Sequence, residues 1–274
     1  MKTTKHYFLA IVTLLFFNFS VFAQDEAPKR PEYVVVTTMH WNMDNEDFDM
    51  KEWIATEKEY MEKVTKKNEL VMGASFYTHR YTDDNTELLY VQTYASWEDI
   101  DKAGDRNGEL AKEAWPNEDA RGDYFDKRQS YYADLHSDEI YATMSGAKLM
   151  GEDPTEDMIL YVRKSHFAFP EDGSFEEFKE LRDEFLEKVF HKNELIKGYY
   201  PNSHAWGADR TEYVEAFIVD SMTDLDEMFD RNAELMKEAW PDEAARKERG
   251  KKVGKYFTGV HGDYIYTSVS ELSK

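Results

Sequence analysis

Six histidines are the side chains of this sequence whose type and placement best suit chemistry. They form two matched sets, His40, His79 and His136 in the first half and His166, His204 and His261 in the second. Imidazole has its ordinary pKa near neutrality, so it can exchange protons with a ligand or accept its hydrogen bonds. Asp138 and Asp263 follow the last histidine of each set by two residues, which on a strand places acid and imidazole on one face. All eight side chains are candidate ligand-binding residues.

Three interpretations of the histidines stay open. They could form a structural polar layer hydrogen-bonded to nearby backbone, a binding or acid–base site, or a metal site. The metal interpretation is disfavoured, because the chain has no cysteine, no HExxH motif and no spacing typical of two histidines and one carboxylate. No motif identifies a cofactor either.

A second recurrent pair follows in each half, Arg106 with Asn107 and Arg231 with Asn232. An arginine beside an asparagine at a cleft could bind a carboxylate or another anion. The alternative is an ion-paired helix surface, because Glu109 lies three residues after Arg106.

An internal repeat organises these candidates. Shifting the chain by 125 residues aligns 67–143 with 192–268 without a gap, with 31 identities in 77 positions, including KNEL at 67–70 and EAWP at 113–116. The sequence therefore predicts two copies of one domain, 33–143 and 158–272, joined by a linker at 144–157.

Each copy has the pattern of a βαββαβ domain. In the first copy we expect a strand at 33–41, an amphipathic helix at 49–66, and a hairpin of 70–82 and 87–95. A second helix from Ser96 to Trp115, a polar helical segment at 117–130 and a strand at 136–143 complete the copy. The second copy repeats this order, with its first strand at 158–169 and first helix at 175–191. The fold class is α+β, two tandem ferredoxin-like domains.

This order places each histidine set at one end of a sheet. The first and fourth strands are neighbours, so we expect His40 and His136 to meet. His79 should lie on the far edge strand, about 10 Å or more away. We expect at most one of the two copies to keep a working pocket. The first copy is slightly favoured, because Arg80 and Tyr81 beside His79 offer polar contacts to a ligand.

The element order, the aromatic helix ends and the tandem duplication resemble the dimeric α/β-barrel superfamily. It includes antibiotic-biosynthesis-type monooxygenases, stress-responsive A/B-barrel proteins and NIPSNAP-like domains. Members often build a barrel from two subunits, so the resemblance implies that the two sheets here pair within one chain as a pseudo-dimer. The activities in the superfamily range from cofactor-free oxygenation to simple ligand binding, and the fold selects none of them.

Composition and the N-terminal segment limit the partners. With 56 acidic and 34 basic residues and a net charge of −22, the chain is a poor ligand for nucleic acid or anionic membranes. The N-terminal segment has the pattern of a signal peptide at 1–23: two lysines, Lys2 and Lys5, an apolar run to Phe22, and the cleavage-site residues Val21-Phe22-Ala23. This pattern predicts export to the periplasm or medium. There is no cysteine for a lipid anchor. No later segment of the sequence is long and apolar enough to cross a membrane.

These features predict an exported small-molecule-binding protein of the α/β-barrel type. It would act as a monomer with pseudo-dimeric repeats or as a higher oligomer, and the histidine cluster could serve a cofactor-light enzyme. The alternative is a non-catalytic structural or interaction module. A cavity beside the histidines would favour the enzyme, and a filled barrel would favour the module.

Overall fold

Eight antiparallel strands close into one barrel in the computed structural model, which describes residues 30–151 and 154–274. The expected signal peptide lies outside the described residues. The strands of the first repeat are β1 (Tyr33–Trp41), β2 (Val71–Tyr81), β3 (Glu87–Tyr94) and β4 (Tyr132–Thr143). Those of the second are β5 (Ile159–Phe167), β6 (Gly198–Trp206), β7 (Glu212–Val219) and β8 (Phe257–Ser273). Their order around the barrel is β1-β3-β2-β8-β5-β7-β6-β4.

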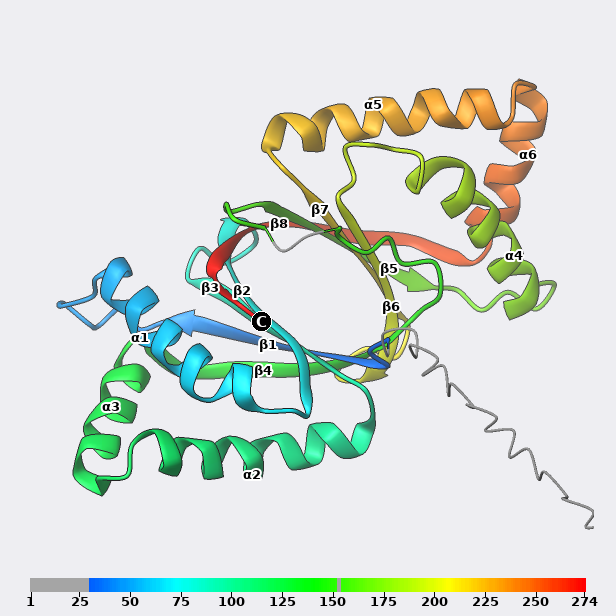
Figure 1. Ribbon diagram of the computed structural model, residues 1–274. Helices are drawn as coiled ribbons and strands as arrows, with labels where there is room; N and C mark the ends of the chain where they lie inside the picture. The colour runs from blue at the N-terminus through cyan, green and yellow to red at the C-terminus, as the bar shows by residue number, and fades with distance from the viewer. Residues whose placement is uncertain (1–29, 152–153) are drawn as a thin grey trace, which may run out of the picture.

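The helices cover the outside of the barrel in two groups. Those of the first repeat are α1 (Met50–Lys63), the short 3₁₀ turn η1 (Thr65–Lys67), α2 (Trp97–Ala114) and α3 (Glu118–Ser130). Those of the second are α4 (Phe175–Phe185), a π-helical turn η2 (Leu186–Phe190), α5 (Met222–Ala239) and α6 (Glu243–Gly254). The two groups lie on opposite sides of the barrel (Figure 1). Two βαββαβ halves therefore build a single barrel, as the resemblance to the dimeric α/β-barrel superfamily implies.

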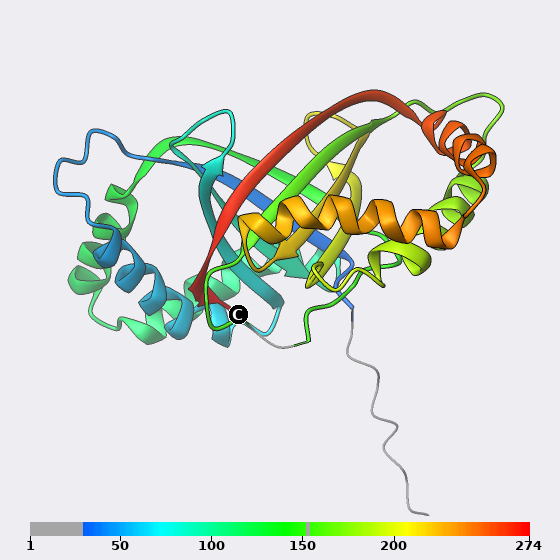
Figure 2. The same cartoon turned by 90° about the horizontal axis from the view of Figure 1, so that it is seen from above.

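Two strand pairs between the repeats close the barrel. Strand β2 pairs with β8, and β4 pairs with β6, both antiparallel. Strand β8 is much longer than its counterpart β4 and crosses the whole barrel (Figure 2). Closure pairs both edges of each four-stranded sheet, which removes the exposed backbone groups that an edge strand would present.

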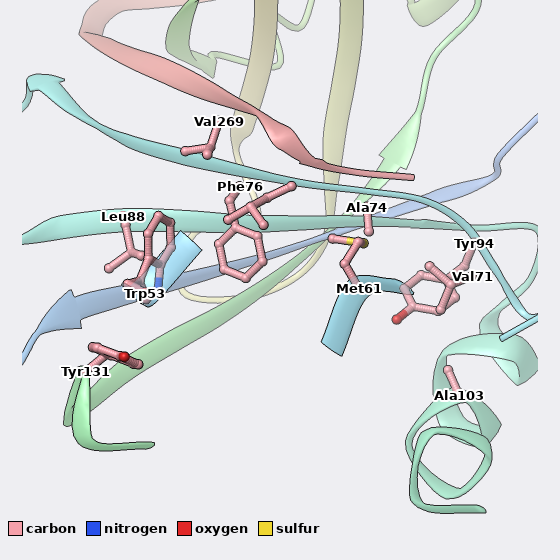
Figure 3. Packing of buried hydrophobic residues seen from close by; sticks show 11 residues of the cluster. Trp53, Met61, Val71, Ala74, Phe76, Leu88, Tyr94, Ala103, Tyr131 and Val269 are labelled. Atoms are coloured by element: carbon pink, nitrogen blue, oxygen red, sulfur yellow. The ribbon is translucent and has the colours of Figure 1, made fainter. Parts of the chain in front are cut away.

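The core has three layers because successive strand residues alternate between the two faces. One cluster, which includes Trp53 of α1 and Phe76 of β2, fills the space between the first sheet and its helices (Figure 3). A second, around Tyr199 and Phe217, does the same in the second repeat. A third, which includes Leu89 and Leu160, lines the inside of the barrel and joins the repeats.

Side-chain caps begin the helices at the positions that the repeat predicts. Ser96 accepts from the backbone N–H of Asp99, and Ser221 accepts from that of Asp224. In the part of the chain that the structure describes, no helix is both long and apolar enough to cross a membrane.

Candidate functional site

Four histidines lie at one rim of the barrel, bound to the hairpin turns that follow β2 and β6. His40 Nδ1 lies 3.4 Å from Asp84 Oδ2 and 3.1 Å from Thr86 Oγ1, and His79 Nδ1 lies 2.8 Å from Thr82 Oγ1. Hydrogen bonds from Thr86 lower the pKa of Asp84, and the nearby charges of His40 and His79 lower it less.

The second repeat repeats this arrangement. His166 Nδ1 is 3.0 Å from Asp209 Oδ2 and 3.2 Å from Thr211 Oγ1, and His204 Nε2 is 3.4 Å from the carbonyl oxygen of Gly207. At the rim, the histidine side chains thus satisfy polar groups of their own turns.

The expected meeting of His40 and His136 is wrong. Strand β1 pairs with β4 so that Met39, not His40, lies opposite His136, and a register shift follows between Met39 and Trp41. Because side chains alternate, His40 projects to the barrel side and His136 to the outer side. His136 Nε2 instead lies 3.6 Å from Asp138 Oδ2.

Strand β3 lies between β1 and β2, so His79 is two strands away from His40 in the first sheet. The outer side of β2 is not free, since it pairs with β8 of the second repeat. The turn from β2 to β3 places Asp84 near enough for the charges of both His40 and His79 to act on it.

The arginine–asparagine pairs belong to the packing of the second helix in each repeat. Arg106 Nε and Nη1 lie 3.2 Å from Glu69 Oε2 and 2.9 Å from Glu109 Oε2. Asn107 accepts a hydrogen bond of 2.8 Å from fully buried Asn68, whose side chain also donates to the carbonyl oxygen of Ala103.

The same set recurs in the second repeat. Arg231 pairs with Glu194 and Glu234, and Asn232 accepts from fully buried Asn193 at 2.9 Å. These contacts explain why the KNEL and Arg-Asn motifs are present in both copies.

A cavity of about 430 Å³ lies between the outer face of the second sheet and its helices, and we call it the helix-side pocket. Strands β5, β7 and β8 form its floor, and α4, α5 and α6 cover it. Phe178, Phe185 and Trp240 contribute aromatic walls. Its charged lining is mainly basic, with Arg163, Arg182, Arg246 and Arg249 against the single acid Glu215.

Two of these arginines have buried atoms without a partner. The Nε–H groups of Arg163 and Arg182 are buried and donate to no acceptor among the described residues. Arg182 is held in place by Nη2, which donates to Ser145 and to Asp183 Oδ1 at 3.0 Å, while the residue itself is only 8% exposed. A buried N–H of a guanidinium without an acceptor is costly. Both arginines also line the pocket, so their guanidinium groups are available to an acceptor that enters it.

Glu215 of β7 lies on the floor of the pocket, near enough for the charges of Arg163 and Arg182 to act on it. Its neighbours across the strands include Arg163, and Tyr199 donates to Glu215 Oε1 at 2.7 Å. Burial raises the pKa of Glu215, and the hydrogen bond from Tyr199 and the charge of Arg163 oppose this effect. The Glu215 residue is only partly buried, and it lines the pocket.

The first repeat fills the corresponding space. Phe125 and Arg128 of α3 occupy positions where α6 has Gly250 and Val253. Phe125 packs against Trp115 and Tyr60, and Arg128 binds buried Glu57 at 2.8 Å. A Cβ added at Gly250 would meet no atom within 4 Å. The small residues that leave room for the helix-side pocket are thus specific to the second repeat, whereas the sequence analysis slightly favours a working pocket in the first.

Of the six candidate histidines, His261 is the one that lines the helix-side pocket. Its Nε2 lies 3.2 Å from Asp263 Oδ2, and Asp263 also accepts from Tyr161 at 2.6 Å. Sequence reasoning missed Arg163, Arg182 and Glu215. The comparison of the two copies contains a signal for two of them. Arg182 aligns with Glu57, and Glu215 aligns with Tyr90, so the side-chain charge differs between the copies at both positions.

Solved structures share this architecture over nearly the whole chain. A chlorite dismutase variant from Candidatus Nitrospira defluvii superposes with a TM-score of 0.53 at 10% identity, covering 89% of this chain and 94% of that chain. A proposed monooxygenase from Lactobacillus acidophilus NCFM gives 0.52 at 9%, covering 88% and 94%. One from Fusobacterium nucleatum gives 0.52 at 12%, covering 87% and 92%. This chain has the dimeric α/β-barrel fold. No family model and no curated protein matches its sequence.

The dimeric α/β-barrel fold hosts different chemistries, so the function has to be argued from the pocket. Within residues 30–151 and 154–274, no group of three or more histidine, cysteine or acidic side chains is arranged to hold a metal ion. The pocket instead offers guanidinium donors, aromatic walls and one histidine. These groups suit a small organic anion.

Proposed function

We propose that this protein binds a small organic anion, a carboxylate on an apolar or aromatic body, in the helix-side pocket of its second repeat. The observation that carries the proposal is the lining of the pocket, in which four arginines meet one acid and the buried Nε–H groups of Arg163 and Arg182 have no acceptor among the described residues. A carboxylate would accept from both arginines in charge-assisted hydrogen bonds, and Phe178 and Trp240 would contact its body.

The difference between the repeats supports this proposal. In the first repeat, the acid Glu57 and the base Arg128 satisfy each other and fill the space. In the second repeat, the arginines outnumber the acid of the pocket, although the whole chain carries a net charge of −22. A basic pocket in a strongly acidic protein favours an anionic occupant.

The test is a titration with three ligands of one shape and different charge: naphthoate, naphthalenemethanol and naphthylmethylammonium. We expect naphthoate to bind at least about tenfold more tightly than the other two. Arg163→Gln should remove most of this preference, because it removes a guanidinium donor whose Nε–H has no partner among the described residues. Equal binding of the three ligands would contradict the proposal.

A second candidate function is acid–base chemistry on the bound anion. It is favoured by His261, which lines the pocket and has its Nε2 paired with Asp263. An imidazole held by a carboxylate can accept a proton from a ligand. A His261→Gln variant that binds naphthoate normally but loses turnover of a native ligand, identified by mass spectrometry of the purified protein, would support this candidate. Normal turnover by that variant would exclude it.

Export is part of the proposal as well. The leader at 1–23 predicts that the mature protein meets its ligand outside the cytoplasm. A bound anion would then be an extracellular or periplasmic compound.

A further inference from the structure

The inside of the barrel holds a separate and larger cavity of about 620 Å³, which we call the barrel lumen. Inward-facing side chains from all eight strands line it. An eight-stranded barrel is just wide enough to be filled by its side chains or to hold one small ligand. Here the inner side chains leave space, so the second case applies.

The middle of the barrel lumen is an apolar belt. It is formed by short aliphatic side chains, Val36, Leu89, Val91, Val162, Val214 and Ala216. Aliphatic residues of this size leave a channel between facing strands, and burying an alkyl chain there would be favourable by about 0.8 kcal/mol per methylene. The belt therefore fits an elongated apolar group.

One end of the belt is polar and mainly acidic. Tyr141 Oη lies 2.5 Å from Glu139 Oε2 and 2.8 Å from Glu212 Oε2, so its one hydrogen is shared between two carboxylates. Tyr266 donates to Glu87. Lys164 Nζ lies 3.2 Å from Glu139 and 4.0 Å from Glu212. Two carboxylates thus lie close to one ammonium group, and Glu87 adds a third acid at this end of the barrel.

The charge of Glu139 is fixed by its surroundings. Burial alone would raise its pKa, but hydrogen bonds from Tyr141 and Lys164 outweigh burial and lower the pKa. Glu139 is therefore ionised at neutral pH. Because Lys164 neutralises at most one of the three acids, this end of the lumen attracts a further cation.

A difference between the two repeats indicates that the acidic end of the lumen is more than a structural contact between them. Tyr141 and Tyr266, and likewise Glu87 and Glu212, are identical in the two copies and bond across them. Glu139, in contrast, aligns with Tyr264. One extra acid facing the cavity distinguishes one side of an otherwise two-fold arrangement.

We propose that the barrel lumen is a second binding site, for an amphiphilic cation with a primary ammonium head and an unbranched apolar tail. The head would lie against Glu139 and Glu87, and the tail would lie in the aliphatic belt. The site is independent of the helix-side pocket, since the two cavities share no lining residue.

Calorimetric titration with decylammonium, decanol and decanoate tests the site. Decylammonium should bind with one-to-one stoichiometry, about tenfold or more tightly than decanol, and decanoate should bind most weakly. Glu139→Gln should weaken decylammonium about tenfold and leave decanol unchanged, because only the charge is lost. Ala216→Trp should weaken both ligands, because the indole occupies the belt.

Matched variants keep the test specific. Glu98→Gln removes an exposed acid of α2 and should leave decylammonium binding unchanged. Gly250→Phe, which fills the helix-side pocket, should leave it unchanged too. Equal weakening by Glu98→Gln and Glu139→Gln would show surface attraction and overturn the proposal, as would preferred binding of decanoate. If Ala216→Trp does not fold, the comparison of Glu139→Gln with Glu98→Gln still decides.

Discussion

Tyr141 of the first repeat donates to Glu212 of the second at 2.8 Å, and the corresponding Tyr266 of the second donates to Glu87 of the first. This reciprocal pair joins the repeats inside the barrel, beside the strand pairs that close it. Each phenol also satisfies a carboxylate that is largely removed from water. These two hydrogen bonds join the repeats by polar contacts, in addition to the apolar contacts of the core that the repeats share inside the barrel.

Removal of either phenol oxygen should therefore destabilise the whole chain. We expect Tyr141→Phe and Tyr266→Phe each to lower the free energy of unfolding by about 1 to 3 kcal/mol, because a carboxylate loses its buried donor. Urea denaturation measures the effect. Tyr81→Phe, at a side chain that is 63% exposed, is the control and should change little. A loss no larger than that of the control would contradict the structural role.

Filling the helix-side pocket should abolish binding of an organic anion without unfolding the protein. Gly250→Phe introduces the side chain that the first repeat has at Phe125, into space where a Cβ meets no neighbour. We expect naphthoate binding to fall by more than about tenfold while the melting temperature is kept or raised. Gly250→Ala is the matched control, since it increases helix propensity without filling the cavity. Loss of binding in both variants would point to α6 itself.

The titration of Glu215 should make stability and binding depend on pH. Burial raises its pKa in the folded protein above the ordinary 4.5, so the folded state holds the proton more tightly than the unfolded chain. Stability is then lost as the pH rises from the unfolded value through the folded one. Glu215→Gln removes this loss, so the melting temperature of the variant should rise relative to that of the wild type as the pH increases above 4.5.

Binding of the anion should follow the same titration. Ionised Glu215 repels a carboxylate, so naphthoate affinity should decrease as the pH rises through the raised pKa, and Glu215→Gln should flatten the profile. A constant difference in melting temperature and parallel binding profiles would show that Glu215 does not titrate in this range.

The asparagines beneath the second helices should matter for folding and not for binding. Asn68 is fully buried and bonds Ala103, Asn107 and the N–H of Leu70. We expect Asn68→Ala to cost about 3 kcal/mol, since it leaves several buried groups unsatisfied. Arg106→Ala, at an exposed ion pair, should have little effect. Loss of naphthoate binding in Arg106→Ala at normal stability would restore the earlier anion-site interpretation of that residue.

The leader makes a prediction about the mature chain. N-terminal sequencing of protein from its native host should find a start near Gln24, after Val21-Phe22-Ala23. An intact Met1 on protein in the cytosolic fraction would contradict export.

The architecture could be predicted from the sequence because it depends on patterns that occur in both repeats. The identical Glu-Ala-Trp-Pro segments fix the end of both second helices, and the order of the elements fixes the split βαβ topology. The closing pairs β2–β8 and β4–β6 follow once two such sheets must bury their inner faces.

The site was less predictable because it depends on the faces and offsets of strands. A displacement of one residue, which sets Met39 opposite His136, moves His40 to the other side of the sheet. Arg163 and Glu215 are far apart in the sequence and meet only through the β5–β7 pairing. The helix-side pocket arises because Gly250 and Val253 are small, and the absence of large side chains at two positions does not form a recognisable sequence motif.

A crystal structure of the protein grown with naphthoate tests the central claim most directly. We predict the carboxylate in the helix-side pocket, with oxygen atoms about 2.7 to 2.9 Å from guanidinium nitrogen atoms of Arg163 and Arg182, and the rings against Phe178 and Trp240. Naphthoate bound elsewhere, with neither guanidinium group in contact with its carboxylate, would contradict the claim.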